Sequence, residues 1–555
     1  MKFLPDHASE FAKTIIEPSM KQQGDSIPVS AMSVDGKIPT GTSCLEKRGI
    51  APRVPTWNAA NCLQCNVCSL SCPHAAIRAK QIAPADLANA PATFKTVKSK
   101  TKNDKDLQFK IQVYIEDCTG CGVCVDVCPM TKQADEKKVL TWSTLEKERA
   151  AGENENEKFF DALPDNVTDG APITTVKGAM FRKPLFEFSG ACAGCGETPY
   201  VKLMAQLFGE NVIIANATGC SSIYGGTFPT IPYTKDKNGR GPAWANSLFE
   251  DNAEFGYGMR LAVDQNRATL KSYVEKVLAC DKACDKLKAA LNKAMSFWDN
   301  SKTEEAVAAQ NEVKAILPKA LENAEGECRE VLAKIQELQD YFCDKSVWIV
   351  GGDGWANDIG YGGIDHVVAQ NRNVNILVLD TEVYSNTGGQ ASKATPTAAV
   401  AKFATGGKKT YKKNMGFMCM SYGYVYVASV AMGADRNQVL KAFQEAEAYN
   451  GPSIIFAYAP CIAHGIDMSK TQSEEKRAVD AGYWPLYRYN PSKEVPFSWD
   501  AKKPTGNFQE FIRSEGRYKS LLKTAPAHAE ELYKKAEEDA AKRMEFYQKV
   551  GELMK

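Results

Sequence analysis

Short apolar runs alternate with longer segments of helical spacing over the second half of the chain. Five such runs lie at 212–215, 347–350, 374–379, 424–427 and 453–456. Runs of this length, separated by helix-length segments, are typical of strands that are buried on both faces of a parallel sheet. The pattern therefore predicts a doubly wound α/β domain over residues 181–555.

The segment 262–342 interrupts this alternation. It is rich in Ala, Lys and Glu, and its apolar residues recur at helical spacing, as in VDQNRATLKSYVEKVLACDKACDKLKAALNK. We predict a helical insertion here. Cys280 and Cys284 are expected on helix faces rather than in a metal site.

The first 180 residues divide into three segments of different character. Residues 1–55 are punctuated by Pro and Gly, which predicts a connecting or wrapping segment. Residues 56–140 hold two cysteine clusters and predict a small separate domain. Residues 141–180 are acidic and loosely patterned, which predicts a linker between the two domains.

Composition and charge narrow the classes of function. The chain has 555 residues, with 68 basic and 67 acidic side chains and a formal net charge of +1. A chain of this length is too long for one ordinary hydrophobic core, so we expect two or more domains. The near-zero charge gives no electrostatic reason to expect a nucleic acid or an anionic membrane as partner. No apolar run reaches the roughly 18 to 20 residues of a spanning helix. The first residues lack the apolar region of a signal peptide, so we expect a cytoplasmic protein.

Two cysteine runs share the spacing C-x2-C-x2-C-x3-C-P. They are CLQCNVCSLSCP from Cys62 and CTGCGVCVDVCP from Cys118, in a chain with 18 cysteines and only 5 histidines. This is the spacing of bacterial ferredoxins, in which the fourth cysteine of each run binds the other 4Fe-4S cluster. Zinc, which commonly uses two separated C-x-x-C pairs, is the weaker interpretation. The predicted ligand sets are Cys62, Cys65, Cys68 and Cys128 for one cluster, and Cys118, Cys121, Cys124 and Cys72 for the other.

Polar loops follow two of the predicted strands. GGDGWAND spans 351–358, and TEVYSNTGG spans 381–389. The carboxyl ends of parallel strands share one edge of the sheet, where open sheets bind ligands. Mg²⁺ prefers hard oxygen ligands and takes several from phosphates. The Asp353 carboxylate, the Thr381 hydroxyl and the Val383 carbonyl are therefore candidate Mg²⁺ ligands, and the nearby glycines would let backbone N–H groups approach a diphosphate. This is the layout of a thiamine diphosphate motif, with Thr381 where Asn is usual.

Further motifs accompany these loops, namely GACAGCGETPY, NATGCSSIYGG, DTEVYSNTGGQASKATP and APCIAHG. With them, nearly the whole chain resembles the C-terminal half of the pyruvate:ferredoxin (flavodoxin) oxidoreductases, in which Thr is the rule at the position of Thr381. The resemblance implies a thiamine diphosphate-binding, doubly wound parallel-sheet domain. It also implies a preceding α+β domain of the bacterial ferredoxin type, which holds two 4Fe-4S clusters.

The resemblance implies a third 4Fe-4S cluster, bound by Cys192, Cys195, Cys220 and Cys461. Cys220 follows the run at 212–215 and Cys461 follows the run at 453–456, so both fall at the sheet edge that carries Asp353. A lone buried cysteine is more often a small apolar residue. The shared position with a C-x-x-C pair favours the role of ligand.

The same resemblance implies which residues line the cofactor. Glu197 and Asn386 are the expected catalytic residues, with Asn386 at the substrate end; by itself Glu197 would equally suit a solvated loop. His464 is expected to support the site from behind. The cofactor-lining set is Glu197, Cys220, Gly352, Asp353, Gly354, Trp355, Thr381, Glu382, Val383, Tyr384, Ser385 and Asn386.

The implied reaction is the oxidative decarboxylation of pyruvate with coenzyme A to acetyl-CoA and CO₂. Electrons would pass through three 4Fe-4S clusters to ferredoxin or flavodoxin. Nothing in the chain matches the pyrimidine-binding domain that completes a thiamine site, so we expect a partner domain or subunit and a homo-oligomeric assembly. Two alternatives stay open, an oxidoreductase for another 2-oxoacid and an electron-transfer subunit without catalysis. Four cysteines have no expected role beyond packing: Cys44, Cys328, Cys343 and Cys419.

Overall fold

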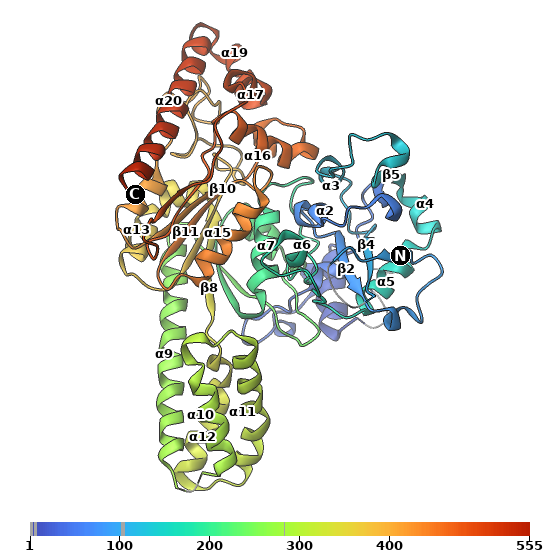
Figure 1. Ribbon diagram of the computed structural model, residues 1–555, viewed down its shortest axis with the longest axis vertical. Helices are drawn as coiled ribbons and strands as arrows, with labels where there is room; N and C mark the ends of the chain where they lie inside the picture. Colours follow the sequence, from blue (N-terminus) through green and yellow to red (C-terminus); the bar gives the residue numbers. More distant parts are fainter. Residues whose placement is uncertain (1–3, 5–7, 102–105, 282, 555) are drawn as a thin grey trace.

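The computed structural model describes residues 4, 8–101, 106–281 and 283–554. A large α/β domain lies at the centre, a smaller domain lies beside it, and a bundle of helices projects from the large domain (Figure 1). No helix within the described ranges combines the length and the apolar character needed to cross a membrane.

An eight-stranded sheet forms the core of the large domain, in the order β13-β12-β10-β11-β9-β8-β6-β7. The six strands from β10 to β7 in this order are parallel, and β12 and β13 continue one edge with antiparallel pairing. The strands are β6 (Val212–Ala217), β7 (Ala243–Ser247), β8 (Ser346–Gly352), β9 (Asn375–Asp380), β10 (Tyr426–Val430), β11 (Ser453–Tyr458), β12 (Tyr487–Tyr489) and β13 (Phe497–Trp499).

All five strands predicted from apolar runs are confirmed. The pattern misses β7, β12 and β13, because these strands at or next to the sheet edges are short or carry polar residues that do not stand out from loops. The parallel, doubly wound character is confirmed as well, since successive residues of β9 enter different cores. Ile376 and Val378 pack on one side of the sheet, whereas Leu377 and Leu379 pack on the other.

Helices cover both faces of this sheet. On one side, the core includes residues of α13 (Tyr361–Ala369) and of the C-terminal helix α20 (Pro526–Leu553). On the other side, it includes α7 (Thr198–Phe208) and α15 (Arg436–Ala448). Because both faces are buried, the central strands can be apolar throughout, which is why they were visible in the sequence.

The helical insertion is a four-helix bundle with its own apolar core (Figure 1). Its helices are α9 (Asn252–Ala279), α10 (Asp285–Ser296), α11 (Glu304–Glu322) and α12 (Gly326–Leu338). The first helix begins ten residues before the predicted start, because its first half packs on the sheet. A Cβ at Gly256 would lie 2.4 Å from Ile349. Cys280 and Cys284 stand at helix ends, as the residue after α9 and the residue before α10, rather than on helix faces.

The smaller domain contains two antiparallel sheets. One joins β1 (Arg53–Trp57) with β5 (Leu140–Thr144), and the other has the order β2-β4-β3. These last strands are β2 (Ile77–Ile82), β3 (Val97–Lys98) and β4 (Gln108–Val113). Two short helices, α2 (Val67–Ser71) and α3 (Val123–Asp126), carry the middle of each cysteine run.

The segment 141–180 is not a simple linker. It contributes most of β5 and three helices, and Phe160 is buried in the core of the small domain. The acidic residues that suggested a linker face other partners, as when Glu157 pairs with Lys47 at 2.7 Å. The acidic composition of this segment therefore did not reveal that part of it forms an amphipathic helix, with Phe160 on its buried side. The helices are α4 (Leu145–Ala150), α5 (Glu153–Ala162) and α6 (Val176–Ala179).

The described part of residues 1–55 contacts both domains. The Gly41 N–H donates to the Tyr233 carbonyl of the large domain at 2.6 Å, and the Gly49 N–H donates to the Glu116 carbonyl of the small domain at 2.8 Å. Most of the segment consists of short helical turns. These contacts are those of a segment that runs across two folded units.

Candidate cofactor and cluster sites

Asp353 lies at the carboxyl end of β8, against the loop that follows β9. It is fully buried. Its Oδ1 accepts from the backbone N–H of Thr381 at 3.1 Å and from the Thr381 hydroxyl at 3.0 Å. The same hydroxyl lies 3.1 Å from the Val383 carbonyl oxygen. The three oxygens predicted to bind Mg²⁺ are therefore close together, because the Thr381 hydroxyl lies within hydrogen-bonding distance of both the Asp353 carboxylate and the Val383 carbonyl. Oxygen atoms of this kind are the ligands that Mg²⁺ prefers.

The pKa of Asp353 is raised well above its ordinary range, first by burial and then by the nearby carboxylate of Asp380, against the opposing charge of Lys412. Ser392 donates to the second carboxylate oxygen of Asp353 at 2.9 Å. A buried carboxylate is stable as an anion only beside a cation. The corner is thus suited to a divalent ion.

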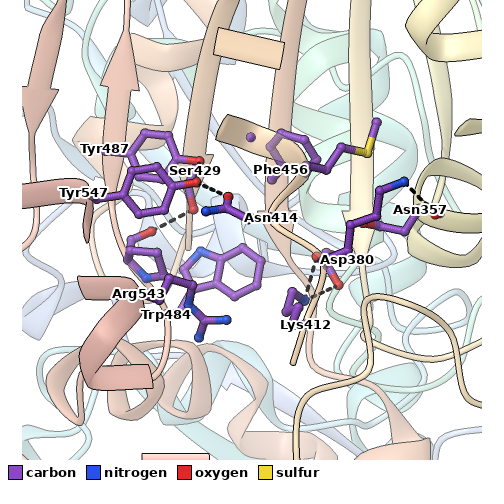
Figure 2. A pocket seen from close by; sticks show the side chains of 14 residues that line it. Asn357, Asp380, Lys412, Asn414, Ser429, Phe456, Trp484, Tyr487, Arg543 and Tyr547 are labelled. Atoms are coloured by element: carbon purple, nitrogen blue, oxygen red, sulfur yellow. Dashed lines mark hydrogen bonds and ion pairs between the residues drawn. The ribbon is translucent and has the colours of Figure 1, made fainter. Parts of the chain in front are cut away.

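Glu382 points away from this corner, contrary to its prediction as a residue that lines the cofactor. Its side chain is fully buried, with Lys412 at 3.0 Å and Arg517 at 2.9 Å. Burial would raise the pKa of Glu382, but the two cations outweigh it and hold the pKa at about 2. Lys412 also binds both carboxylate oxygens of Asp380 (Figure 2). Thr381 and Val383 face the pocket, whereas the side chain of Glu382, which stands between them, faces the interior of the domain.

The other predicted residues line one pocket beside the corner. A Cβ at Gly354 would lie 2.4 Å from the Tyr384 ring, so glycine is required for this close approach. Phe249 and Thr218 also line the pocket and were not predicted. The predicted members are Glu197, Cys220, Gly352, Gly354, Trp355, Thr381, Val383, Tyr384, Ser385 and Asn386.

Glu197 is the buried acid of this pocket. It is 5% exposed, its Oε2 has no hydrogen-bond partner, and burial raises its pKa to about 7. An unpartnered carboxyl oxygen in a buried site is costly unless a ligand supplies the missing contact. Together with the oxygens at Asp353, this orphaned atom shows that the residues fit a bound cofactor.

The four cysteines dispersed over the large domain line a second cavity of about 140 Å³. Cys192 and Cys195 come from the loop before α7, Cys220 follows β6, and Cys461 follows β11. Glu197, Cys220, Thr381 and Asn386 line this cavity and the cofactor pocket alike. Within the described ranges, no three His, Cys, Asp or Glu side chains converge on a single-ion position. The four cysteines line one cavity, and four thiolates are the usual ligand set of a 4Fe-4S cluster.

His464 supports the loop of the Mg²⁺ corner. It is fully buried, and its Nε2 lies 2.7 Å from the Thr381 carbonyl oxygen. Burial and the charge of Arg517 lower the pKa of His464 to about 3, so the ring is neutral at physiological pH. Its predicted position behind the cofactor residues agrees with this contact.

The two ferredoxin-type runs come together in the small domain in the crossed arrangement. One cavity is lined by Cys72 of the first run and by Cys118, Cys121 and Cys124 of the second. Burial raises the pKa of Cys68 well above its usual value, and the neighbouring thiols of Cys65, Cys62 and Cys128 raise it further. Each group of four contains three cysteines from one run and the last cysteine of the other.

Comparisons with known proteins match both domains. A model of the thiamine pyrophosphate enzyme C-terminal TPP binding domain matches residues 333–457, which include β8, β9, β10 and all but the last residue of β11. A model of the 4Fe-4S double cluster binding domain matches residues 61–131. Residues 2–51 match a domain of unknown function called EKR, whose extent is close to the predicted wrapping segment.

The pyruvate:ferredoxin oxidoreductase of Moorella thermoacetica is 54% identical over 549 residues, which cover 98% of this chain and 46% of that protein. The pyruvate-flavodoxin oxidoreductase of a Nostoc species is 48% identical over 98% of this chain and 45% of its own length. The chain corresponds to the C-terminal portion of these oxidoreductases. It spans less than half the length of the relatives it matches.

The chain also aligns with a solved 2-oxoglutarate:ferredoxin oxidoreductase from Magnetococcus marinus. The alignment covers 50% of this chain and 67% of that chain, at 14% identity and a TM-score of 0.29. So low a score carries no conclusion about function.

Three supporting residues of the candidate site were not predicted from the sequence. Ser392 binds Asp353, and Lys412 and Arg517 bind Glu382. Ser392 stands in the motif DTEVYSNTGGQASKATP, so position alone could have suggested it. Lys412 and Arg517 lie 30 and 135 positions after Glu382 in unremarkable segments, and only the folded chain brings them to it.

Proposed function

We propose that this chain carries the diphosphate-binding and electron-transfer parts of an enzyme that oxidises pyruvate. The reaction is decarboxylation with coenzyme A to acetyl-CoA and CO₂, and three 4Fe-4S clusters pass the electrons to ferredoxin or flavodoxin. The observation that carries the proposal is the shared wall between the cavity of the four dispersed cysteines and the pocket beside Asp353, formed by Glu197, Cys220, Thr381 and Asn386.

The chain's own residues have distinct tasks in this proposal. Asp353, the Thr381 hydroxyl and the Val383 carbonyl would hold Mg²⁺, an ion that commonly binds diphosphate groups. Thiamine diphosphate, when bound, supplies a sink for the electrons that remain when CO₂ departs. Glu197 and Asn386 face the reacting end, where Glu197 orients or holds a proton. Glu197 and Asn386 also line the cavity proposed for the third cluster, so electrons would travel only a short distance from the cofactor to that cluster.

The ligands of the three clusters are proposed as the sequence predicted them. Cys192, Cys195, Cys220 and Cys461 bind the cluster next to the cofactor. The two crossed groups of the small domain bind the other two clusters. Support comes from the cavities lined by the dispersed cysteines and by the group of Cys72, from the proximity of Cys62, Cys65 and Cys128 to Cys68, and from the match to a double cluster binding domain.

A partner region completes the site in this proposal. Ile223 and Ile462 stand at the cysteine cavity with exposed fractions of 52% and 64%. Large apolar side chains beside a pocket are positions that another protein surface covers. The partner is a pyrimidine-binding domain or subunit, and complete units assemble as a homo-oligomer.

Anaerobically purified protein tests the proposal. We expect bound thiamine diphosphate and Mg²⁺ in equal amounts, about twelve irons for each chain, and reduction of a viologen dye with pyruvate and coenzyme A once the pyrimidine-binding region is present. An Asp353→Asn variant should lose the Mg²⁺ and the cofactor but keep the irons. Turnover by the chain alone would contradict the need for a partner. Preference for a different 2-oxoacid would contradict the proposed substrate.

A further inference from the structure

Lys202 of α7 reaches out of the large domain into the small one. Its side chain is buried, and the residue is only 2% exposed. The ammonium donates to the carbonyl oxygens of Leu70 at 2.9 Å and Cys72 at 2.8 Å, and also to the carbonyl of Ser69. All three acceptors lie in or just after the second half of α2: Ser69 and Leu70 follow the third cysteine of the first run, and Cys72 is its fourth cysteine. Three carbonyl acceptors use all three N–H groups of a protonated lysine.

No carboxylate pairs with Lys202 among the described residues. Burial lowers the pKa of Lys202 to about 8, which leaves the ammonium form predominant at pH 7. Thiolates at Cys72 and Cys68 favour this form, whereas Arg78, a cation that has its own partner in Glu187, opposes it. An ammonium taken out of water without a counter-ion is costly. Carbonyl dipoles at a helix end offset only part of that cost. The position therefore favours a negative charge at the cysteines, which a thiolate-bound iron–sulfur cluster supplies.

Lys202 lies between the cofactor pocket and the cysteine runs of the small domain. The same helix begins directly after Glu197, and Lys202 lies five residue steps beyond Glu197, at a rise of about 1.5 Å for each step. Leu70 of α2 packs in the core that α7 helps to form. Figure 1 shows α7 on the side of the large domain that faces α2 and α6. One short helix thus links the cofactor pocket with the peptide that joins Cys68 to Cys72.

We propose that Lys202 is a redox-tuning residue, whose buried positive charge raises the reduction potential of the cluster bound by Cys72, Cys118, Cys121 and Cys124. The inference rests on the proposed cluster ligands. In the step concerned, this cluster gains one electron that comes from substrate oxidation by way of the third cluster. No covalent bond forms or breaks, and Lys202 keeps its protons. Charge and hydrogen bonds around the sulfurs are known determinants of such potentials.

Lys80 offers a matched control in the same small domain. It is also a buried lysine, 8% exposed, and it donates to the carbonyls of Phe160 and Leu163 at 2.9 and 3.0 Å. Unlike Lys202, it has a carboxylate partner, Asp165, at 2.9 Å. No cysteine is among the groups that shift its pKa. Removing Lys80 therefore removes a buried lysine without removing a charge that faces a cluster.

The test is a redox titration of the anaerobically purified protein, followed by the EPR signals of the reduced clusters. In Lys202→Met and Lys202→Gln, we expect one cluster potential to fall so that its ratio of reduced to oxidised form at a fixed potential drops about tenfold, which is about 59 mV for one electron. Lys202→Arg and Lys80→Met should leave the potentials close to those of the wild type. Iron content measured on the same samples tests the proposed ligands separately.

Three results would overturn the proposal. The first is unchanged potentials in both neutral variants with all irons retained. The second is an equal shift in Lys80→Met, which would make the effect one of general loosening. The third is the loss of irons from both neutral variants, which would make Lys202 a structural clamp on α2 rather than a residue that tunes potential.

Discussion

The imidazole of His464 donates its Nε2–H to the backbone carbonyl of Thr381, at 2.7 Å. The direction is certain because a carbonyl oxygen only accepts. His464 stands three residues after Cys461, the fourth proposed ligand of the third cluster, while Thr381 is a proposed ligand of Mg²⁺. One hydrogen bond thus ties the cluster loop to the metal loop, so that disturbing either site is expected to affect the other.

His464→Phe should weaken Mg²⁺-dependent binding of thiamine diphosphate. The change leaves the buried Thr381 carbonyl without its donor, which costs about 1 to 3 kcal/mol. We expect this cost to appear as a roughly tenfold loss of affinity for thiamine diphosphate. Binding can be followed by the quenching of tryptophan fluorescence. His528 is exposed, and His528→Phe serves as the control. Equal affinity in His464→Phe and the wild type would show that the bond does not position the loop.

Glu475→Gln should make stability less dependent on pH. Glu475 is fully buried, accepts from the Gly433 N–H at 2.7 Å and from the Tyr200 hydroxyl at 3.0 Å, and burial raises its pKa to about 8 from 4.5. Between these two values the folded state holds the proton more often than the unfolded state does. The free energy of unfolding of the wild type must therefore fall as pH rises from about 4.5 to about 8.

The neutral amide of Glu475→Gln has no such proton to lose. Its midpoint of thermal unfolding, relative to that of the wild type, should rise steadily between pH 5 and pH 8 under anaerobic conditions. A difference that stays constant over this range, or that reverses, would mean that Glu475 is already ionised in the fold.

Cys461→Ala should reduce the iron content from about twelve to about eight per chain, because one 4Fe-4S cluster loses a ligand while the two clusters of the small domain keep all of theirs. Cys343 is a buried cysteine outside every proposed site, and Cys343→Ala is the matched control. Full iron content in Cys461→Ala would remove this residue from the proposed ligand set.

Gly194→Ala should disrupt the loop that holds Cys192 and Cys195. Gly194 has φ = +82°, and a Cβ there would lie 2.2 Å from the Met468 carbonyl oxygen. The unfavourable backbone conformation alone costs about 1 to 3 kcal/mol. We expect loss of four irons or a clear fall in the unfolding temperature. In Gly190→Ala the new methyl group has only the Arg48 side chain nearby, at 3.6 Å, so this variant should behave like the wild type.

Sequence alone determined the features whose signals are local. The spacing of the two cysteine runs, the strands β6, β8, β9, β10 and β11, and the loops after β8 and β9 could all be read from short segments. Each depends on residues within about a dozen positions of one another. Buried parallel strands are apolar throughout, and a loop at a strand end shows its chemistry in its own residues.

Only the tertiary structure decided how distant segments meet. It turned Glu382 toward Lys412 and Arg517, and folded residues 141–180 into the small domain. It also placed Lys202 against the end of α2. These contacts depend on the order of the strands and on the docking of two domains. Neither the strand order nor the docking produces a periodic or local pattern in the sequence, because the residues that come into contact are far apart along the chain.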